Sequence, residues 1–139
     1  MNPVNEKSKL VGLDLAWAEV GDFHDCFGHP APDSPALIEH KRAHLRSKWM
    51  CEEIDEFLVA ATVVDQADAM VDLIYFALGT LVEMGVPPQE IFAIVHKANM
   101  SKLGPDGKVH YNSDGKVIKP ASWCPPEPQI LEYVKSISK

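Results

Sequence analysis

The feature that most constrains the fold is residues 51–78 (CEEIDEFLVAATVVDQADAMVDLIYFAL), an apolar segment that acidic residues interrupt at helical spacing. Asp72 is the clearest case, because apolar residues flank it on both sides from Ala69 to Leu78. A lone ionised carboxylate buried in such a helix costs several kcal/mol unless a partner or a proton neutralises it. The sequence should therefore supply a partner for Asp72.

Helical periodicity covers most of the first hundred residues. Apolar residues recur at three- and four-residue spacings, which predicts helices at about 8–27, 36–62, 65–84 and 86–102. Prolines and Asp-Gly pairs dominate the residues that follow, which favours an irregular tail or a small hairpin. We therefore expect an all-α fold, an antiparallel bundle of four to five helices, in a single domain over 1–139 with its core at about 8–103 and a turn-rich tail at about 104–139.

The net charge of −7 and the pI near 5.3 argue against nucleic acid or an anionic membrane as the main partner. The three cysteines, Cys26, Cys51 and Cys124, are widely separated, which is typical of reduced thiols. No basic-then-apolar signal segment is seen at the N-terminus, and no apolar run is long enough to span a bilayer. These features predict a cytoplasmic protein.

The segments at 36–62 and 65–84 should form an antiparallel hairpin with its turn near residues 62–64. Glu53 then faces Asp72, and Glu56 faces Asp68. Four carboxylates that converge between two helices repel one another unless a cation lies among them. Oxygen ligands alone suit Mg²⁺ or Mn²⁺ rather than zinc.

The acidic residues have two other interpretations, a di-iron site and a solvated helix face. A di-iron carboxylate bundle needs Glu-x-x-His pairs, and no glutamate in this chain has a histidine three residues later. Acidic residues on a helix are usually a solvated face, and Glu52 and Asp55 fit that interpretation as well as they fit a site.

EEIDE at 52–56, followed by ADAMVDLIYFALGT at 67–80, resembles the all-α nucleotide pyrophosphohydrolases of the MazG-like and phosphoribosyl-ATP pyrophosphohydrolase superfamily. Their pattern is EExxE, a spacer and ExxD on two neighbouring helices. Asp72 matches the final Asp, but Ala69 stands where the pattern has Glu, and Asp68 is the candidate replacement. The resemblance covers about residues 17–125, and matches to the first half of the pattern are Glu52, Glu53 and Glu56.

The resemblance implies a Mg²⁺-dependent enzyme that cleaves the α–β anhydride of a (deoxy)nucleoside triphosphate to a nucleoside monophosphate and pyrophosphate. The metal ligands would be Glu53, Glu56, Asp68 and Asp72, and Glu52 or Glu53 would be the general base. It also implies a homodimer or homotetramer that completes the bundle. Two alternatives stay open. One is a phosphoribosyl-ATP-type or other specialised pyrophosphohydrolase. The other is an inactive nucleotide- or metal-binding module, because Ala69 stands where the family pattern has Glu.

Basic and aromatic residues after the acidic segment are candidates to bind substrate. They are Lys97, Asn99, Lys102, Lys116, Lys119 and Trp123. The alternative is that the lysines complement the helix dipole in solvent and that Trp123 anchors the tail. Arg42 and Arg46, one turn apart, either guard the pocket or pair with surface acids, and surface pairing is the simpler expectation.

Overall fold

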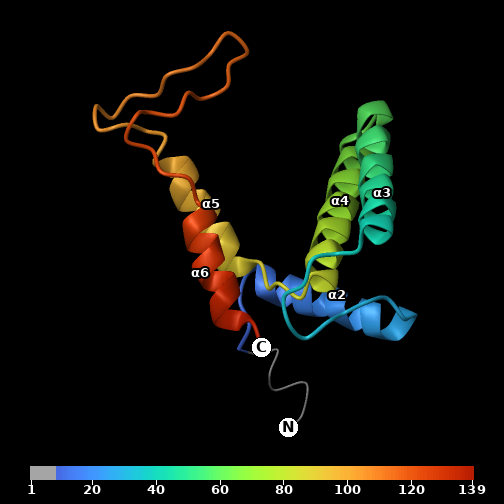
Figure 1. Cartoon of the computed structure of the whole chain (residues 1–139). Coiled ribbons are helices and arrows are strands. Elements are labelled where there is room, and N and C mark those ends of the chain that lie inside the picture. Colours follow the sequence, from blue (N-terminus) through green and yellow to red (C-terminus); the bar gives the residue numbers. More distant parts are fainter. Residues whose placement is uncertain (1–8) are drawn as a thin grey trace. The chain divides into compact units, whose positions relative to one another are not determined.

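The computed structural model describes residues 9–139, and the helices are labelled as in Figure 1. They are α2 (Leu13–Phe27), α3 (His40–Val59), α4 (Val63–Glu83), α5 (Gln89–Met100) and α6 (Glu127–Ile137). Between residues 9 and 139 there is no strand, and one isolated antiparallel bridge joins Tyr111 to Val117. The predicted all-α fold class is confirmed.

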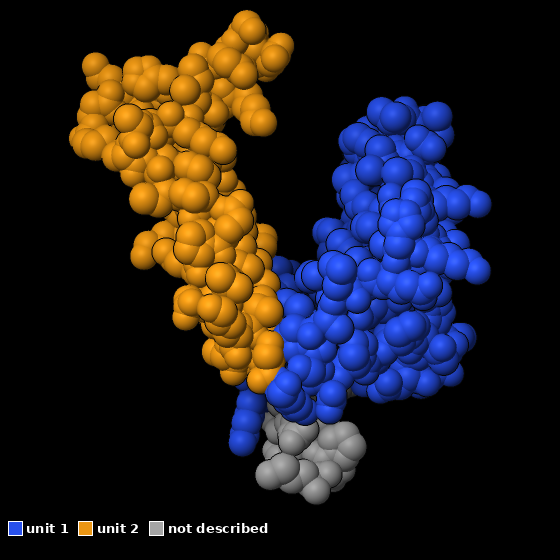
Figure 2. Space-filling model, in the orientation of Figure 1, with its two compact units in different colours: residues 1–88, 139 blue, residues 89–138 orange. Residues whose placement is uncertain are grey.

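The chain divides into two compact units, coloured separately in Figure 2. One comprises the described residues up to Pro88 together with Lys139, and the other comprises Gln89–Ser138. In the first unit α4 packs against both α2 and α3. In the second unit α5 packs against α6, and the turn-rich segment joins them. The boundaries of a single domain over 1–139 stay a prediction.

The core of the first unit lies between α2 and α4. Val20 packs with Leu78 and Val82, and the partly buried Ala16 and Trp17 lie against them. Leu78 and Val82 are four residues apart on α4, so one face of that helix supplies both. Burial of each such side chain contributes about 1.5–3 kcal/mol, which fixes α2 across α4.

The hairpin of α3 and α4 is confirmed, with the two helices side by side in Figure 1. The connection is short, and Thr62 caps the second helix. The Asp65 N–H donates to Thr62 Oγ1 over 3.1 Å, and Thr62 Oγ1 donates to Asp65 Oδ2 over 2.8 Å. Because this reciprocal cap sets the start of α4 at Val63, it also sets which residues of α3 and α4 face each other.

Two boundaries differ from the expectation. The second helix begins at His40 rather than near residue 36, because the Ala36 N–H donates to the Met84 carbonyl over 2.9 Å and Glu39 is extended. The tail, expected to be irregular, ends in α6, where Ile130, Val134 and Ile137 are partly buried at helical spacing. No helix within the described residues is long and apolar enough to cross a membrane.

Candidate active site

The predicted acidic residues come together in the first unit. Glu53 and Glu56 lie on α3, and Asp68 and Asp72 lie on α4. The pKa of Glu53 is raised, first by burial and then by the negative charges of Glu56 and Asp72, with Asp68 adding to them. The hairpin register predicted from the sequence therefore brings all four carboxyl groups into one electrostatic cluster, which we call the acidic cluster.

Glu53 carries an unpaired polar atom. Its Oε2 is buried and has no hydrogen-bond partner among the described residues, although the residue as a whole is only partly buried. A buried carboxylate oxygen without a donor is costly, and a cation would compensate it. The donors are all oxygens, which is the set that Mg²⁺ prefers. The chemistry of the acidic cluster therefore fits a divalent cation.

The acidic cluster is open rather than a closed cage. Within residues 9–139, the set of three or more candidate ligand side chains whose atoms all lie within 4.8 Å of one another is His24, His29 and Glu83, and none of the four carboxylates belongs to it. Mg²⁺ commonly keeps several waters and binds through one or two carboxylates together with substrate phosphates. An open arrangement leaves room for both.

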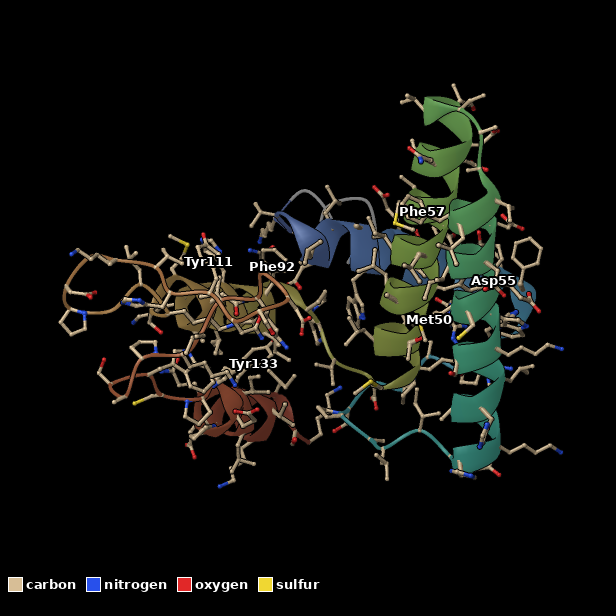
Figure 3. All side chains as sticks on the ribbon, turned by 90° about the horizontal axis from the view of Figure 1, so that it is seen from above. Met50, Asp55, Phe57, Phe92, Tyr111 and Tyr133 are labelled. Atoms are coloured by element: carbon tan, nitrogen blue, oxygen red, sulfur yellow. The ribbon has the colours of Figure 1, made fainter. Side chains whose placement is uncertain are left out.

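Three further acidic residues, Glu52, Asp55 and Asp65, lie near the acidic cluster in the sequence. Glu52 and Asp55 are both exposed, and Figure 3 labels Asp55 on α3. Asp65 is engaged in the cap of α4. Ala69 is 2% exposed and faces the packed side of its helix, whereas the charge of Asp68 acts on Glu53. The role of Asp68 as the replacement for the expected glutamate stays a prediction.

An aromatic cavity lies one helical turn from the acidic cluster. Trp49 precedes Glu53 by four residues on α3, and Phe76 follows Asp72 by four on α4. The centroids of the Trp49 and Phe76 rings are 5.9 Å apart. The cavity has a volume of about 280 Å³, and its lining residues are Phe23, His24, His29, Arg46, Trp49, Tyr75 and Phe76.

A buried ion pair supports one wall of the aromatic cavity. Glu83 is 5% exposed and accepts from Arg42 Nε over 2.6 Å and Arg42 Nη2 over 3.1 Å. Arg46 Nη1 lies 2.8 Å from Glu83 Oε2. The expected pairing of Arg42 and Arg46 with surface acids is therefore wrong. Their partner is a buried glutamate, because Glu83 sits on the inner face of α4.

Arg46 also holds the cavity in shape. It is 3% exposed, and it donates from Nε to Thr80 Oγ1 over 3.1 Å and from Nη2 to the Phe76 carbonyl over 2.8 Å. Its guanidinium carbon lies 5.3 Å from the centroid of the Trp49 ring. Gly79 makes this possible, because a Cβ there would collide with the guanidinium of Arg46. Arg46 thus ties the aromatic wall to the backbone of α4.

His24 and His29 complete the same wall. Gly28, with φ of 72°, ends α2 in the left-handed conformation, and the His29 N–H then donates to the His24 carbonyl over 2.9 Å. His24 Nδ1 donates to the Pro30 carbonyl over 2.9 Å, and Arg42 Nη2 donates to His29 Nδ1 over 2.8 Å. The two rings lie 5.2 Å apart between centroids.

Although His24, His29 and Glu83 lie close enough to share an ion, two features oppose a metal there. Both oxygens of Glu83 already accept hydrogen bonds from arginines, and Nδ1 of His29 already accepts one from Arg42. The sequence analysis missed these three residues. A usable signal was present for Glu83, which interrupts the apolar run of α4 near its end as Asp72 does further back.

The predicted substrate-binding residues all belong to the second unit. Lys97 and Asn99 lie on α5, Lys102 follows it, and Lys116, Lys119 and Trp123 lie in the tail. Trp123 Nε1 donates to the Ala98 carbonyl over 2.8 Å, and Lys119 Nζ lies 4.3 Å from the centroid of the Trp123 ring. These contacts anchor the tail on α5. The role of the six residues in binding substrate stays a prediction.

Lys97 lines a hollow of about 240 Å³ within the second unit, together with Ser101 and Ser122. The side chain of Lys97 is exposed. Tyr111, labelled in Figure 3, lies in the tail and pairs with Val117 across the small turn. The tail is therefore a defined flap on α5 rather than a sheet.

Comparison with known proteins identifies the family of the chain. No curated protein matches the chain. The model of the phosphoribosyl-ATP pyrophosphohydrolase family matches residues 20–99, which include the acidic cluster, the aromatic cavity and the buried ion pair. The resemblance expected from EEIDE and ADAMVD is thus confirmed, and the family indicates a pyrophosphohydrolase that acts on acid anhydrides. Because the match covers more than half of the sequence, the chain belongs to the phosphoribosyl-ATP pyrophosphohydrolase family.

Proposed function

We propose that this protein is a Mg²⁺-dependent nucleotide pyrophosphohydrolase that hydrolyses the α–β anhydride of a nucleoside triphosphate to a nucleoside monophosphate and pyrophosphate. The observation that carries the proposal is the acidic cluster around Glu53, whose Oε2 is buried and unpaired within the described part of the chain. The family match supports the reaction class.

The residues that would hold the metal are Glu53, Glu56, Asp68 and Asp72, and Mn²⁺ suits the same donors. When bound, the ion supplies charge neutralisation at the phosphate oxygens and lowers the pKa of a water ligand. The four carboxylates alone would repel the polyphosphate. The protein therefore needs the cation for binding as well as for chemistry.

Glu53 is the best candidate for the general base. A cation bound in the acidic cluster would lower the pKa of Glu53 from its raised metal-free value and keep the side chain as a carboxylate that can accept a proton. Glu53 would take the proton of the attacking water while the water oxygen bonds to a phosphorus of the α–β anhydride. The bridging oxygen then leaves with one product, and the electron pair of the broken bond goes with it. The exposed Glu52 is the second candidate.

The aromatic cavity would hold the nucleobase. Four residues along a helix correspond to about 6 Å, so the cavity lies one such step from the acidic cluster along both α3 and α4. Its aromatic walls suit a flat ring, and its volume of about 280 Å³ is close to the lower end of the range for ligand pockets. One substrate could then place its base among the rings and its phosphates at the carboxylates.

The substrate need not be an ordinary triphosphate. The family match supports phosphoribosyl-ATP equally well as a substrate. The third alternative, a binding module without catalysis, rests on Ala69 at the position of the expected glutamate.

We also propose a homodimer or homotetramer. Leu58 on α3 and Val71 and Ile74 on α4 are all more than half-exposed, at 72%, 60% and 52%. A helical interface with a second copy would cover them. Light scattering that shows a strict monomer at micromolar concentration would refute this.

The test is pyrophosphate release over a panel of ribo- and deoxynucleoside triphosphates and phosphoribosyl-ATP, with Mg²⁺ and with EDTA. We expect Mg²⁺-dependent release from at least one of them and a loss of at least about 100-fold in Glu56→Gln. Binding of a nucleotide without release of pyrophosphate would indicate the inactive module instead.

A further inference from the structure

We infer that Arg42, held by Glu83, fixes the ring proton of His29 on Nε2, so that His29 gives the aromatic cavity a hydrogen-bond donor and selects a nucleobase with a ring carbonyl over one with an amino group at the same position. The inference rests on the proposed function in one respect only, the placement of the base in this cavity. The state of His29 itself depends on geometry within the first unit.

The geometry is a chain of three side chains. Glu83 accepts two hydrogen bonds from Arg42, and Arg42 Nη2 lies 2.8 Å from His29 Nδ1. A guanidinium is always charged and has no acceptor, so Arg42 must donate in this contact. Nδ1 of His29 must then accept, which places the single ring proton on Nε2.

Arg42 is not free to turn away from His29. Its two hydrogen bonds to Glu83 form the planar fork that a carboxylate prefers, and its guanidinium carbon lies 5.2 Å from the centroid of the Trp49 ring. Glu83 is in turn fixed by Arg46 from its other side. The donor on His29 is therefore preorganised.

The surroundings keep His29 neutral. Burial lowers its pKa most, followed by the positive charge of Arg42 and by His24, and Arg46 acts in the same direction. Glu83 opposes them with a smaller effect.

Two other polar residues of the cavity wall, His24 and Arg46, are already engaged. His24 donates from Nδ1 to the Pro30 carbonyl, and its Nε2 lies so close to Gly79 that an added Cβ there would be 2.9 Å away. Arg46 donates to Thr80 and to the Phe76 carbonyl and pairs with Glu83. The hydroxyl of Tyr75 both donates and accepts, so it does not discriminate. His29 Nε2 and the indole N–H of Trp49 are the remaining lining groups of fixed sense, and both are hydrogen-bond donors.

Nucleotide pairs in which a carbonyl is exchanged for an amino group, with the neighbouring ring nitrogen changing from donor to acceptor, test the selection. UTP against CTP and ITP against ATP are such pairs. We expect the wild-type protein to favour the carbonyl member of at least one pair by about tenfold in kcat/KM, because an amino group would face the His29 donor. His29→Phe keeps a ring but removes this donor while the indole N–H of Trp49 stays, so the ratio should fall toward one.

Arg42→Met should also lower the kcat/KM ratio of carbonyl to amino nucleotide. Without Arg42, the ring proton of His29 can occupy either nitrogen. Lys41→Met is the matched control, because it removes one positive charge from the neighbouring, exposed position of α3 and should leave the ratio unchanged. Unchanged ratios in active His29→Phe and Arg42→Met proteins would overturn the selection.

A second measurement needs no turnover. In a long-range ¹H–¹⁵N spectrum of protein labelled at histidine nitrogens, assigned with His29→Phe, His29 should show a proton on Nε2 and an unprotonated Nδ1 at pH 7. In Arg42→Met the two nitrogens should move toward averaged values, and in Lys41→Met they should not. A proton on Nδ1 of the wild type, or a doubly protonated ring, would overturn the inference. If no nucleotide is hydrolysed at all, the proposed function fails, whereas this spectrum still decides the state of His29.

Discussion

The carboxyl group of Asp72 on α4 lies close enough to that of Glu53 on α3 to raise its pKa. The two residues are far apart in the sequence and meet because the cap at Thr62 sets the register of the hairpin. Two acids that disfavour each other's charge stabilise nothing by themselves. Their proximity supports the proposed cation between them.

Asp72→Asn should weaken metal binding without destabilising the metal-free protein. Removal of one charge relieves the repulsion on Glu53, so the metal-free variant should melt at or above the temperature of the wild type. The rise in melting temperature on addition of Mg²⁺ should shrink, because a ligand is lost. Melting curves of both proteins in EDTA and in Mg²⁺ measure this. Had Asp72 instead paired with a lysine or arginine, the metal-free variant would lose roughly 3–5 kcal/mol and its response to Mg²⁺ would not change.

Gly79→Ala tests the close approach of Arg46 to α4. Alanine normally favours a helix interior over glycine by about 1 kcal/mol, but here its Cβ would collide with the buried guanidinium. We expect a net loss of about 1–3 kcal/mol in the free energy of unfolding, measured by urea denaturation. Gly21→Ala on α2 is the matched control, since nothing lies within 4 Å of its Cβ, and it should be stabilising. A stable Gly79→Ala protein would mean that Arg46 lies elsewhere.

Arg46→Met should leave Glu83 with Arg42 as its one remaining charged partner within the described residues. A buried carboxylate that loses a charged partner destabilises the folded protein. The expected loss is about 3–5 kcal/mol of unfolding free energy. The double variant Arg46→Met with Glu83→Met should recover a large part of it, because no buried carboxylate remains. A single variant within about 1 kcal/mol of wild type would contradict the buried network.

The depressed pKa of His29 predicts a pH dependence of stability. Below its ordinary value of 6.5 the unfolded chain binds a proton at His29 before the folded protein does. The unfolding free energy should therefore be fully present above pH 6.5 and fall as the pH drops below it. Urea denaturation at pH 7.5 and at pH 5.5 should show a larger loss for the wild type than for His29→Phe. Equal losses would show that His29 titrates normally.

The helices and the acidic cluster were predictable from the sequence because both depend on local spacing. Glu53 and Glu56 share a helix face, Asp68 and Asp72 share another, and a short turn at Thr62 brings the faces together. The start of α3 was not predictable, because a tertiary hydrogen bond from Ala36 to Met84 decides it. The helix α6 was predictable in principle from its apolar spacing, but the prolines before it masked the pattern.

The aromatic cavity and its ion pair could not have been assembled from the sequence. They join His24 and His29 near the end of α2, Arg42 and Arg46 on α3, and Glu83 on α4. Each residue taken alone has a common surface role, and no spacing rule links residues on three helices. Their contacts depend on how α2 crosses α4, which the packing of Val20 against Leu78 and Val82 sets.

The most direct test of the central claim is to identify the products of nucleotide hydrolysis by the wild-type protein and by Glu56→Gln in Mg²⁺. The account predicts that the wild type releases pyrophosphate and a nucleoside monophosphate in equal amounts, that EDTA stops the reaction, and that folded Glu56→Gln is at least about 100-fold slower. Release of orthophosphate and a nucleoside diphosphate, or unchanged turnover in Glu56→Gln, would contradict it.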